Sequence, residues 1–209
     1  INVGHGLSKA PEIVIVKVRN DTGSWYANVK NIPSQSAGTD MVAVLNDTAA
    51  LNGYNVGQWF FGSQAPTSSV FRVQNKDDVG ENGDTHVAYC FHSVDGYSKI
   101  GSYIANGEQD DGTFIYTGFR PAFVMIKKAS AAGSWYMTDS ERYDTNRPYG
   151  SAAYLFADSS AAESTTENID MLANGFKARR DSGYFNYPSG ATYIYIAFAE
   201  TPFKYSNAR

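Results

Sequence analysis

The amino-acid sequence contains an internal duplication, and this feature limits the folds that the chain can adopt. Residues 11–17, Pro-Glu-Ile-Val-Ile-Val-Lys, are followed 110 positions later by Pro-Ala-Phe-Val-Met-Ile-Lys. The tetrapeptide Gly-Ser-Trp-Tyr at residues 23–26 recurs unchanged at residues 133–136. Three further blocks repeat in the same order, at 41–45 and 152–156, 70–73 and 175–178, and 83–91 and 190–198. Repeated blocks in one order predict two similar structural units.

Each repeat has the residue pattern of short β-strands. Apolar, β-branched and aromatic segments are separated by clusters of Gly, Asn, Asp, Ser and Pro, which is typical of strands joined by turns. Residues 13–18 are almost entirely apolar and predict a buried central strand, while residues 85–91 alternate between two faces. Only residues 48–51 and 158–163 allow a helical turn. The sequence therefore predicts an all-β fold of two tandem β-sandwich-like units with very little helix.

The repeats also predict the division of the chain. We expect a first β repeat over residues 1–95, a Gly-rich connector over 96–112 and a second β repeat over 113–209. Apolar segments precede the second copy, whereas only residues 1–6 precede the first, so an upstream strand is expected to be missing there. Because the chain begins at Ile1, with neither an initiator Met nor a signal peptide, we expect a C-terminal part of a larger or cleaved polypeptide.

Charge and cysteine content exclude several classes of function. A net charge of −4 and a pI of about 5.3 argue against nucleic acid as a partner, since phosphate binding needs a basic surface. The single cysteine, Cys90, excludes an internal disulfide. The longest apolar run, residues 193–199, is far shorter than the ~20 residues that span a membrane. We therefore expect no nucleic-acid partner and no membrane insertion.

Candidate catalytic and metal-binding groups are weak. His86, Cys90 and His92 share one face of a strand, but a rise of ~3.3 Å per residue puts His86 about 13 Å from Cys90, too far for one ion. Gly-x-Ser-x-Gly and Gly-rich phosphate motifs do not occur. The acidic stretch 77–84 lacks the spacing of a known calcium loop. We expect no catalytic residues, no metal and no cofactor, and hence a protein that is not an enzyme.

Aromatic residues beside turns are the candidate contact residues. Exposed Trp and Tyr side chains stack on sugars or anchor protein interfaces. Neighbouring residues on a strand point to opposite faces, so in the alternative interpretation one ring of each Trp-Tyr pair fills the core. The sequence leaves both interpretations, surface contact and core packing, open. Residues 59–61, Trp-Phe-Phe, raise the same question. The candidate surface contacts are Trp25, Tyr26, Trp135, Tyr136, Tyr184 and Tyr187.

Several runs of residues resemble a known family. They are Val-Ala-Tyr-Cys-Phe at 87–91, Val-Asp-Gly-Tyr-Ser-Lys at 94–99, Gly-Ser-Tyr at 101–103, Tyr-Thr-Gly-Phe-Arg-Pro-Ala-Phe-Val-Met-Ile-Lys at 116–127 and Ala-Phe-Ala-Glu-Thr-Pro-Phe-Lys-Tyr at 197–205. Together they resemble a duplicated domain of unknown function in virion proteins of tailed bacteriophages, frequent in marine phages. In that family the domain often follows a concanavalin-like sandwich in tail-fibre-like proteins. The resemblance covers nearly the whole chain and transfers no catalytic or binding residue.

The resemblance implies a non-enzymatic virion structural protein that is exposed on the surface of the extracellular particle. A tail-fibre or adhesin-type module that contacts the host cell is the leading hypothesis. The expected partners are other virion proteins, a host surface glycan or protein, and further copies of the chain in a homo-oligomer. One alternative is a capsid decoration protein on the head. The other is a polysaccharide depolymerase, which requires two carboxylates ~5–9.5 Å apart in a groove.

Overall fold

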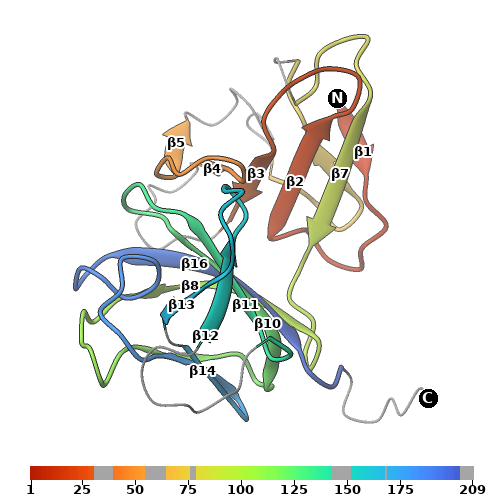
Figure 1. The fold of residues 1–209 in the computed structure, drawn as a ribbon. Coiled ribbons are helices and arrows are strands. Elements are labelled where there is room, and N and C mark those ends of the chain that lie inside the picture. The colour runs from red at the N-terminus through yellow and green to blue at the C-terminus, as the bar shows by residue number, and fades with distance from the viewer. Residues whose placement is uncertain (31–39, 55–64, 76–78, 143–151, 168, 203–209) are drawn as a thin grey trace. The chain divides into compact units, whose positions relative to one another are not determined.

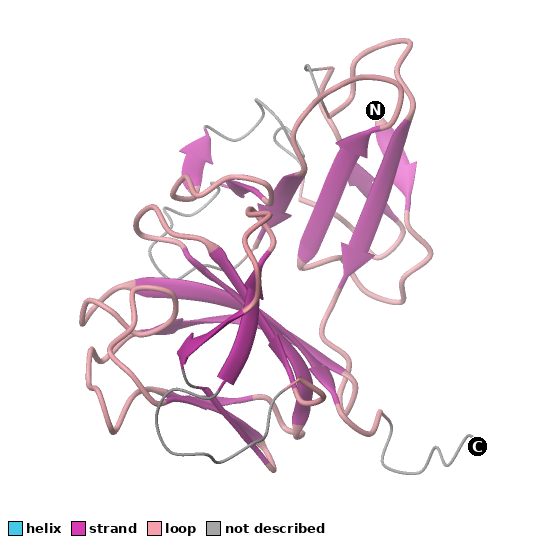
Figure 2. Ribbon diagram, in the orientation of Figure 1, coloured by secondary structure: helices cyan, strands magenta, loops and turns pink. Residues whose placement is uncertain are grey.

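A computed structural model of the chain describes residues 1–30, 40–54, 65–75, 79–142, 152–167 and 169–202. All regular structure in these ranges is β-strand, which confirms the all-β fold class (Figure 2). Over the same ranges no helix is long and apolar enough to cross a membrane. The chain divides into two compact sandwich-like units, Ile1–His92 and Ser93–Arg209.

The first unit consists of a five-stranded sheet and a two-stranded sheet. The larger sheet has the order β5-β4-β3-β2-β7, and the smaller one pairs β1 with β6, all antiparallel. Strands β2 and β7 run side by side in Figure 1. The strands are β1 (Asn2–Gly4), β2 (Ile13–Val18), β3 (Tyr26–Val29), β4 (Asp40–Val44), β5 (Asn52–Tyr54), β6 (Val70–Arg72) and β7 (His86–Phe91).

The core of the first unit is small and mainly aliphatic. Strand β2 is nearly all β-branched and buried along its length, which matches its central place in the sheet. On one face, Val14 and Val16 of β2 pack with Val42 of β4 and Phe71 of β6. Half-buried Val3, Tyr26 and Cys90 pack against this cluster.

The second unit consists of a six-stranded sheet and a three-stranded sheet. Their orders are β13-β12-β11-β10-β16-β8 and β14-β15-β9, again antiparallel. The strands are β8 (Ser98–Ile104), β9 (Phe114–Tyr116), β10 (Pro121–Lys128), β11 (Trp135–Asp139), β12 (Ala152–Phe156), β13 (Ser164–Glu167), β14 (Ile169–Leu172), β15 (Gly175–Ala178) and β16 (Thr192–Ala199).

Aromatic side chains fill the core of the second unit. Tyr103 of β8 stacks on Tyr193 of β16 with 5.4 Å between ring centroids, and Phe176 of β15 packs edge-on against Tyr195. The hydroxyl group of Tyr103 donates a hydrogen bond to the Phe185 carbonyl oxygen at 2.6 Å. Rings of this size bury a large apolar area when their polar ends find partners.

The two units pair their strands in the same order and register. The order β4-β3-β2-β7 in the first unit corresponds to β12-β11-β10-β16 in the second. Strands in equivalent places carry the repeated sequence blocks. Equivalent pairs are Val14–Asn28 and Val124–Thr138, Ile15–Tyr89 and Met125–Ile196, and Val3–Phe71 and Ile115–Phe176.

Residues 96–112, which the glycine content suggested as a connector, contain β8, the outer strand of the six-stranded sheet. The division between the two units lies earlier, between His92 and Ser93. Gly101 lies within β8 opposite Tyr195, and a Cβ atom there would lie 2.9 Å from the tyrosine hydroxyl oxygen. This glycine therefore makes room for the ring of Tyr195.

Candidate functional site

The first Trp-Tyr pair is divided between surface and core. Trp25 is half-buried and stacks on Tyr89 of β7, with ring centroids 6.2 Å apart and an interplanar angle of 26°. Tyr89 is 46% exposed. Tyr26 packs against the aliphatic core of the first unit. Trp25 and Tyr89 thus form a partly exposed aromatic pair.

The second Trp-Tyr pair is buried. Trp135 is 1% exposed and Tyr136 is 0% exposed, so neither side chain is a surface contact. Tyr136 lies in the core of its unit, where it stacks on Tyr154 and meets Phe185 edge-on. The prediction that Trp135 and Tyr136 are surface contacts was therefore wrong. The repeated tetrapeptide indicates where a strand lies, but it does not determine whether the rings on that strand are exposed.

The loop before β16 contains the last two candidates. Tyr184 is half-buried and packs against Tyr154 and Phe156. Tyr187 is 53% exposed, while its backbone is held by the hydroxyl group of Tyr193, which donates to the Tyr187 carbonyl oxygen at 2.6 Å. Only Tyr187 of these two presents a largely exposed ring. Residues 59–61 lie outside the described part of the chain.

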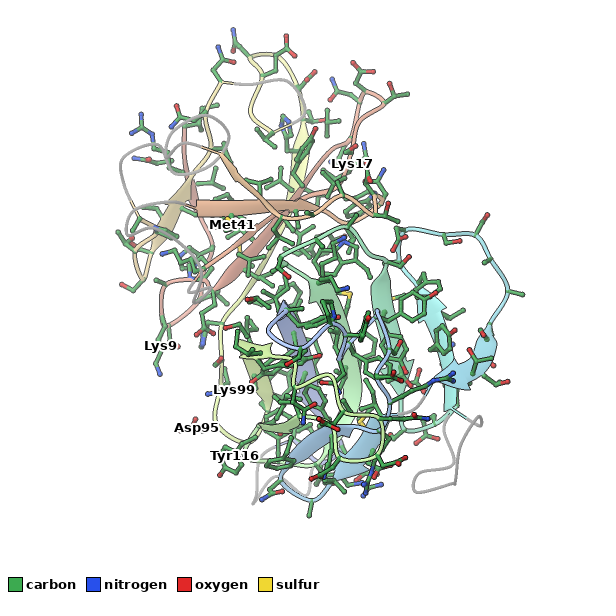
Figure 3. The ribbon with its side chains drawn as sticks, turned by 90° about the vertical axis from the view of Figure 1, so that its left-hand side faces the viewer. Lys9, Lys17, Met41, Asp95, Lys99 and Tyr116 are labelled. Atoms are coloured by element: carbon green, nitrogen blue, oxygen red, sulfur yellow. The ribbon has the colours of Figure 1, made fainter. Side chains whose placement is uncertain are left out.

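Two exposed aromatic residues on β9 were missed by the sequence argument. Phe114 is 43% exposed and Tyr116 is 64% exposed, while Ile115 between them is buried. Tyr116 is labelled on the second unit in Figure 3. Phe114 lies opposite Lys177, whose ammonium group pairs with Asp111. The alternation of residues 113–117 was the available signal, since it places Ile115 on the face opposite both rings.

The first unit contains an apolar cavity of about 500 Å³. Val16 of β2 and Phe71 of β6 contribute to its walls, together with His86, Ala88 and Cys90 along one face of β7. Glu81 and Asp84 also line it. A volume of this size lies within the range of ligand pockets in proteins. The cavity therefore is a candidate binding site in the first unit.

In the second unit, aromatic side chains occupy the equivalent positions. The shared register makes Tyr193, Tyr195 and Ala197 of β16 the counterparts of His86, Ala88 and Cys90. The rings of Tyr193 and Tyr195 lie in the second core, next to Tyr103 of β8. Smaller side chains on β7 thus leave open in one unit a space that tyrosines fill in the other.

Among the described residues, no strand lies along the outer edge of β7, whereas the equivalent edge of β16 is covered. Strand β16 pairs with β10 on one side and β8 on the other. In the described ranges of the first unit, β7 pairs with β2 alone. An open sheet edge presents unpaired backbone N–H and C=O groups to an incoming strand. The cavity and this edge are next to each other, because the same β7 residues contribute to both.

A family model for a domain of unknown function, DUF7483, matches residues 1–202. The chain belongs to this family. No curated protein and no solved structure matches the chain. The DUF7483 description assigns no activity, so the chemistry of this member must come from its own residues.

Over the described ranges of this DUF7483 chain, no group of three His, Cys, Asp or Glu side chains is placed to bind a metal ion. Asp77 and Asp78, part of the acidic stretch considered for calcium, lie outside those ranges. Burial raises the pKa of the Cys90 thiol to about 11, which keeps it neutral. The Nε2 atom of His86 is buried and has no hydrogen-bond partner in the described part of the chain.

Proposed function

We propose that this chain is a non-enzymatic structural protein of a bacteriophage particle. In this proposal it is exposed on the particle surface, as a tail-fibre or adhesin-type module that contacts the host cell. The resemblance of residues 87–91, 94–99, 101–103, 116–127 and 197–205 to phage virion proteins supports the assignment to a phage particle. The observation that carries the contact role is the exposure of aromatic rings held on or next to strands, above all the stacked pair of Trp25, which directly precedes β3, and Tyr89 of β7.

Rings on strands suit recognition of a glycan or protein surface. A strand fixes the backbone, so ordering the contact residue on binding costs little conformational entropy. Tyr and Trp present both an apolar face and a polar end, which is why they are frequent at binding hot spots. Phe114 and Tyr116 of the second unit offer a further pair of exposed rings. Several copies of the chain on one particle would add avidity to weak single contacts.

We also propose that the two units arose by tandem duplication. The five repeated sequence blocks and the equivalent strand registers of both units support this origin. Duplication would supply two rigid scaffolds whose exposed faces are free to diverge. The units differ in this way, since Tyr89 is 46% exposed whereas its counterpart Ile196 is 4% exposed.

The location of the chain on the particle is tested by electron microscopy with antibodies against the chain. Label on tail fibres supports the proposal. Label on the head would refute the tail-fibre role and favour capsid decoration. No label on intact particles would refute exposure on the virion altogether.

The contact residues are tested by binding of the purified chain to host cells. The double variant Trp25→Ala and Tyr89→Ala should bind at least about tenfold more weakly, because aromatic hot spots cost ~2 kcal/mol or more on truncation. The matched control is Ile104→Ala, which removes an exposed but aliphatic side chain of β8. Equal binding by the double variant and the control, with both folded, would refute the assignment of this pair.

A further inference from the structure

We propose that a pocket in the second unit binds an acidic sugar, whose carboxylate group pairs with the ammonium group of Lys128. The open pocket has a volume of about 490 Å³. It is lined by residues 128 and 132–133, at the turn from β10 to β11, and by residues 180–184, which follow β15. The proposed host contact of Trp25 and Tyr89 lies in the first unit, so either proposal can fail without the other.

Lys128 places a positive charge at the C-terminal end of strand β10. The residue is 8% exposed, and its ammonium nitrogen lies 5.7 Å from the centroid of the Tyr193 ring. Among the described residues, no ion pair involves Lys128. Burial lowers the pKa of this ammonium group, since its charged form loses hydration. Buried charges normally have a partner of opposite charge, and a neutral ring replaces that partner only in part. A bound anion would supply the missing charge.

The fold itself does not require a charge at this position. Lys128 of β10 lies opposite Tyr193 of β16. In the first unit, Val18 of β2 lies opposite the equivalent residue, His86. Val18 is therefore the counterpart of Lys128, and it is 1% exposed. Burying a charge in this place costs free energy that burying valine does not, so the lysine is better explained by binding than by folding.

Small residues keep the ammonium group of Lys128 accessible. Its nitrogen atom has no hydrogen-bond partner among the described residues, yet it is not one of the unpartnered polar atoms that are sealed from solvent. A Cβ atom at Gly133 would lie 3.6 Å from the Lys128 Cβ atom and 4.0 Å from the Gly183 carbonyl oxygen. The absence of a side chain at Gly133 therefore keeps open the space between the two lining segments.

Hydrogen bonds fix both lining segments before a ligand binds. The carbonyl oxygen of Ser182 accepts the N–H group of Asn186 at 2.8 Å, and its hydroxyl oxygen accepts the N–H group of Tyr184 at 3.2 Å. On the other side of the pocket, the ammonium group of Lys127 donates to the Gly133 carbonyl oxygen. A site that is fixed in this way loses little conformational entropy on binding.

The charges in the pocket wall suit a singly charged anion that also carries hydroxyl groups. Besides Lys128, the wall contains Arg180, whose guanidinium group donates to the Thr166 carbonyl oxygen at 2.7 Å, and the exposed Asp181. These groups leave one positive charge for a ligand to neutralise, which a carboxylate does and a phosphate dianion exceeds. The Asp181 carboxylate can accept hydrogen bonds from hydroxyl groups, and Tyr184 adds an aromatic side chain to the wall. An acidic sugar has all of the matching groups.

The test is an NMR titration of the whole chain with glucuronate, galacturonate and N-acetylneuraminate. At least one of these sugars should shift the backbone signals of residues 128–134 and 180–184 in a saturable manner. Its methyl ester, which lacks the charge, should bind at least about tenfold more weakly. Absence of binding by all three sugars at millimolar concentration would overturn the proposal, as would equal binding of the acid and its ester. Equal binding of inorganic phosphate would overturn the assignment to a sugar.

A variant of Lys128 tests the role of the charge. Lys128→Met removes the charge and keeps an unbranched side chain, so sugar binding should weaken at least about tenfold. Its melting temperature should stay equal or rise, because the fold no longer buries an unpaired charge. The matched control is Lys99→Met, which removes a positive charge from β8 outside the pocket and should leave binding unchanged. Retained binding by Lys128→Met would overturn the proposal, and so would a large fall in its melting temperature, which a structural lysine would cause.

A second pair of variants locates the sugar without a change in charge. Gly133→Leu fills the space between the lining segments and should weaken binding at least about tenfold. Gly133→Ala adds only a Cβ atom at ordinary contact distances and should bind within about threefold of the unsubstituted chain. Equal binding by folded Gly133→Leu and the unsubstituted chain would place the sugar elsewhere and overturn the proposal.

Discussion

Removal of the Tyr103 ring should open in the second unit the space that is already open in the first. The ring is 8% exposed and lies among Phe176, Tyr193 and Tyr195, with centroid distances of 5.4 to 6.3 Å. Its hydroxyl group binds the Phe185 carbonyl oxygen. The Tyr103→Ala change therefore removes both an aromatic contact and a buried hydrogen bond.

The two parts of this loss have different sizes. Truncating a buried aromatic ring to alanine costs about 3–5 kcal/mol, which includes the cavity that remains. The lost hydrogen bond leaves a buried carbonyl oxygen without its donor and costs about 1–2 kcal/mol. Tyr103→Ala should therefore lower the free energy of unfolding of the second unit by about 4–7 kcal/mol, and Tyr103→Phe by only about 1–2 kcal/mol.

Differential scanning calorimetry measures both variants on the whole chain. The Tyr103→Ala variant should melt more than about 10 °C lower, since 1 kcal/mol shifts the melting temperature of a domain by a few degrees. Tyr116→Ala is the control, because this exposed ring should change stability by less than about 0.5 kcal/mol. A loss below about 1 kcal/mol for Tyr103→Ala, or equal losses for Ala and Phe, would refute the packing argument.

Three further changes test the geometry. Because burial raises the pKa of Cys90 from 9.0 to about 11, its alkylation at pH 8 should be about 100-fold slower than that of an exposed thiol and rise about tenfold per pH unit; an exposed-thiol rate would contradict this. Gly175→Ala should cost at least about 2 kcal/mol in thermal unfolding, because its Cβ atom would lie 2.1 Å from the Ile115 carbonyl oxygen; an unchanged melting temperature would contradict the close approach. Asn186→Ala removes four hydrogen bonds to the loop between β8 and β9. Urea unfolding should show a decrease of about 2–4 kcal/mol in the free energy of unfolding, and an unchanged free energy would show that these hydrogen bonds do not stabilise the loop.

The fold class was predictable because its signals are local. Alternation, β-branched runs and turn residues specify strands without knowledge of the tertiary structure. The repeated blocks align residues that occupy equivalent pairing positions in both units, such as Val14 and Val124. One repeated block was aligned one residue out of register. Val44 pairs with Tyr26, and the residue that pairs with the equivalent Tyr136 is Phe156, whereas the sequence alignment matched Val44 with Leu155. Short apolar blocks without a distinctive residue cannot fix a register.

The candidate site was less predictable, because exposure depends on what packs against each face. Trp25 and Trp135 share the same tetrapeptide, yet one is half-buried and the other 1% exposed. Predicting the cavity requires a comparison of side-chain volumes at equivalent positions far apart in the sequence, such as Ala88 and Tyr195. His86 and Cys90, considered first as metal ligands, lie on the cavity face of β7 instead.

The two units differ on one equivalent strand of their larger sheets. Both cores use equivalent positions in β2 and β10, β4 and β12, and β6 and β15. They diverge on β7 and β16, where tyrosines are replaced by His86 and Ala88 and the covering strand β8 has no counterpart among the described residues of the first unit. The smaller side chains on β7 are therefore the difference that leaves the cavity of the first unit open.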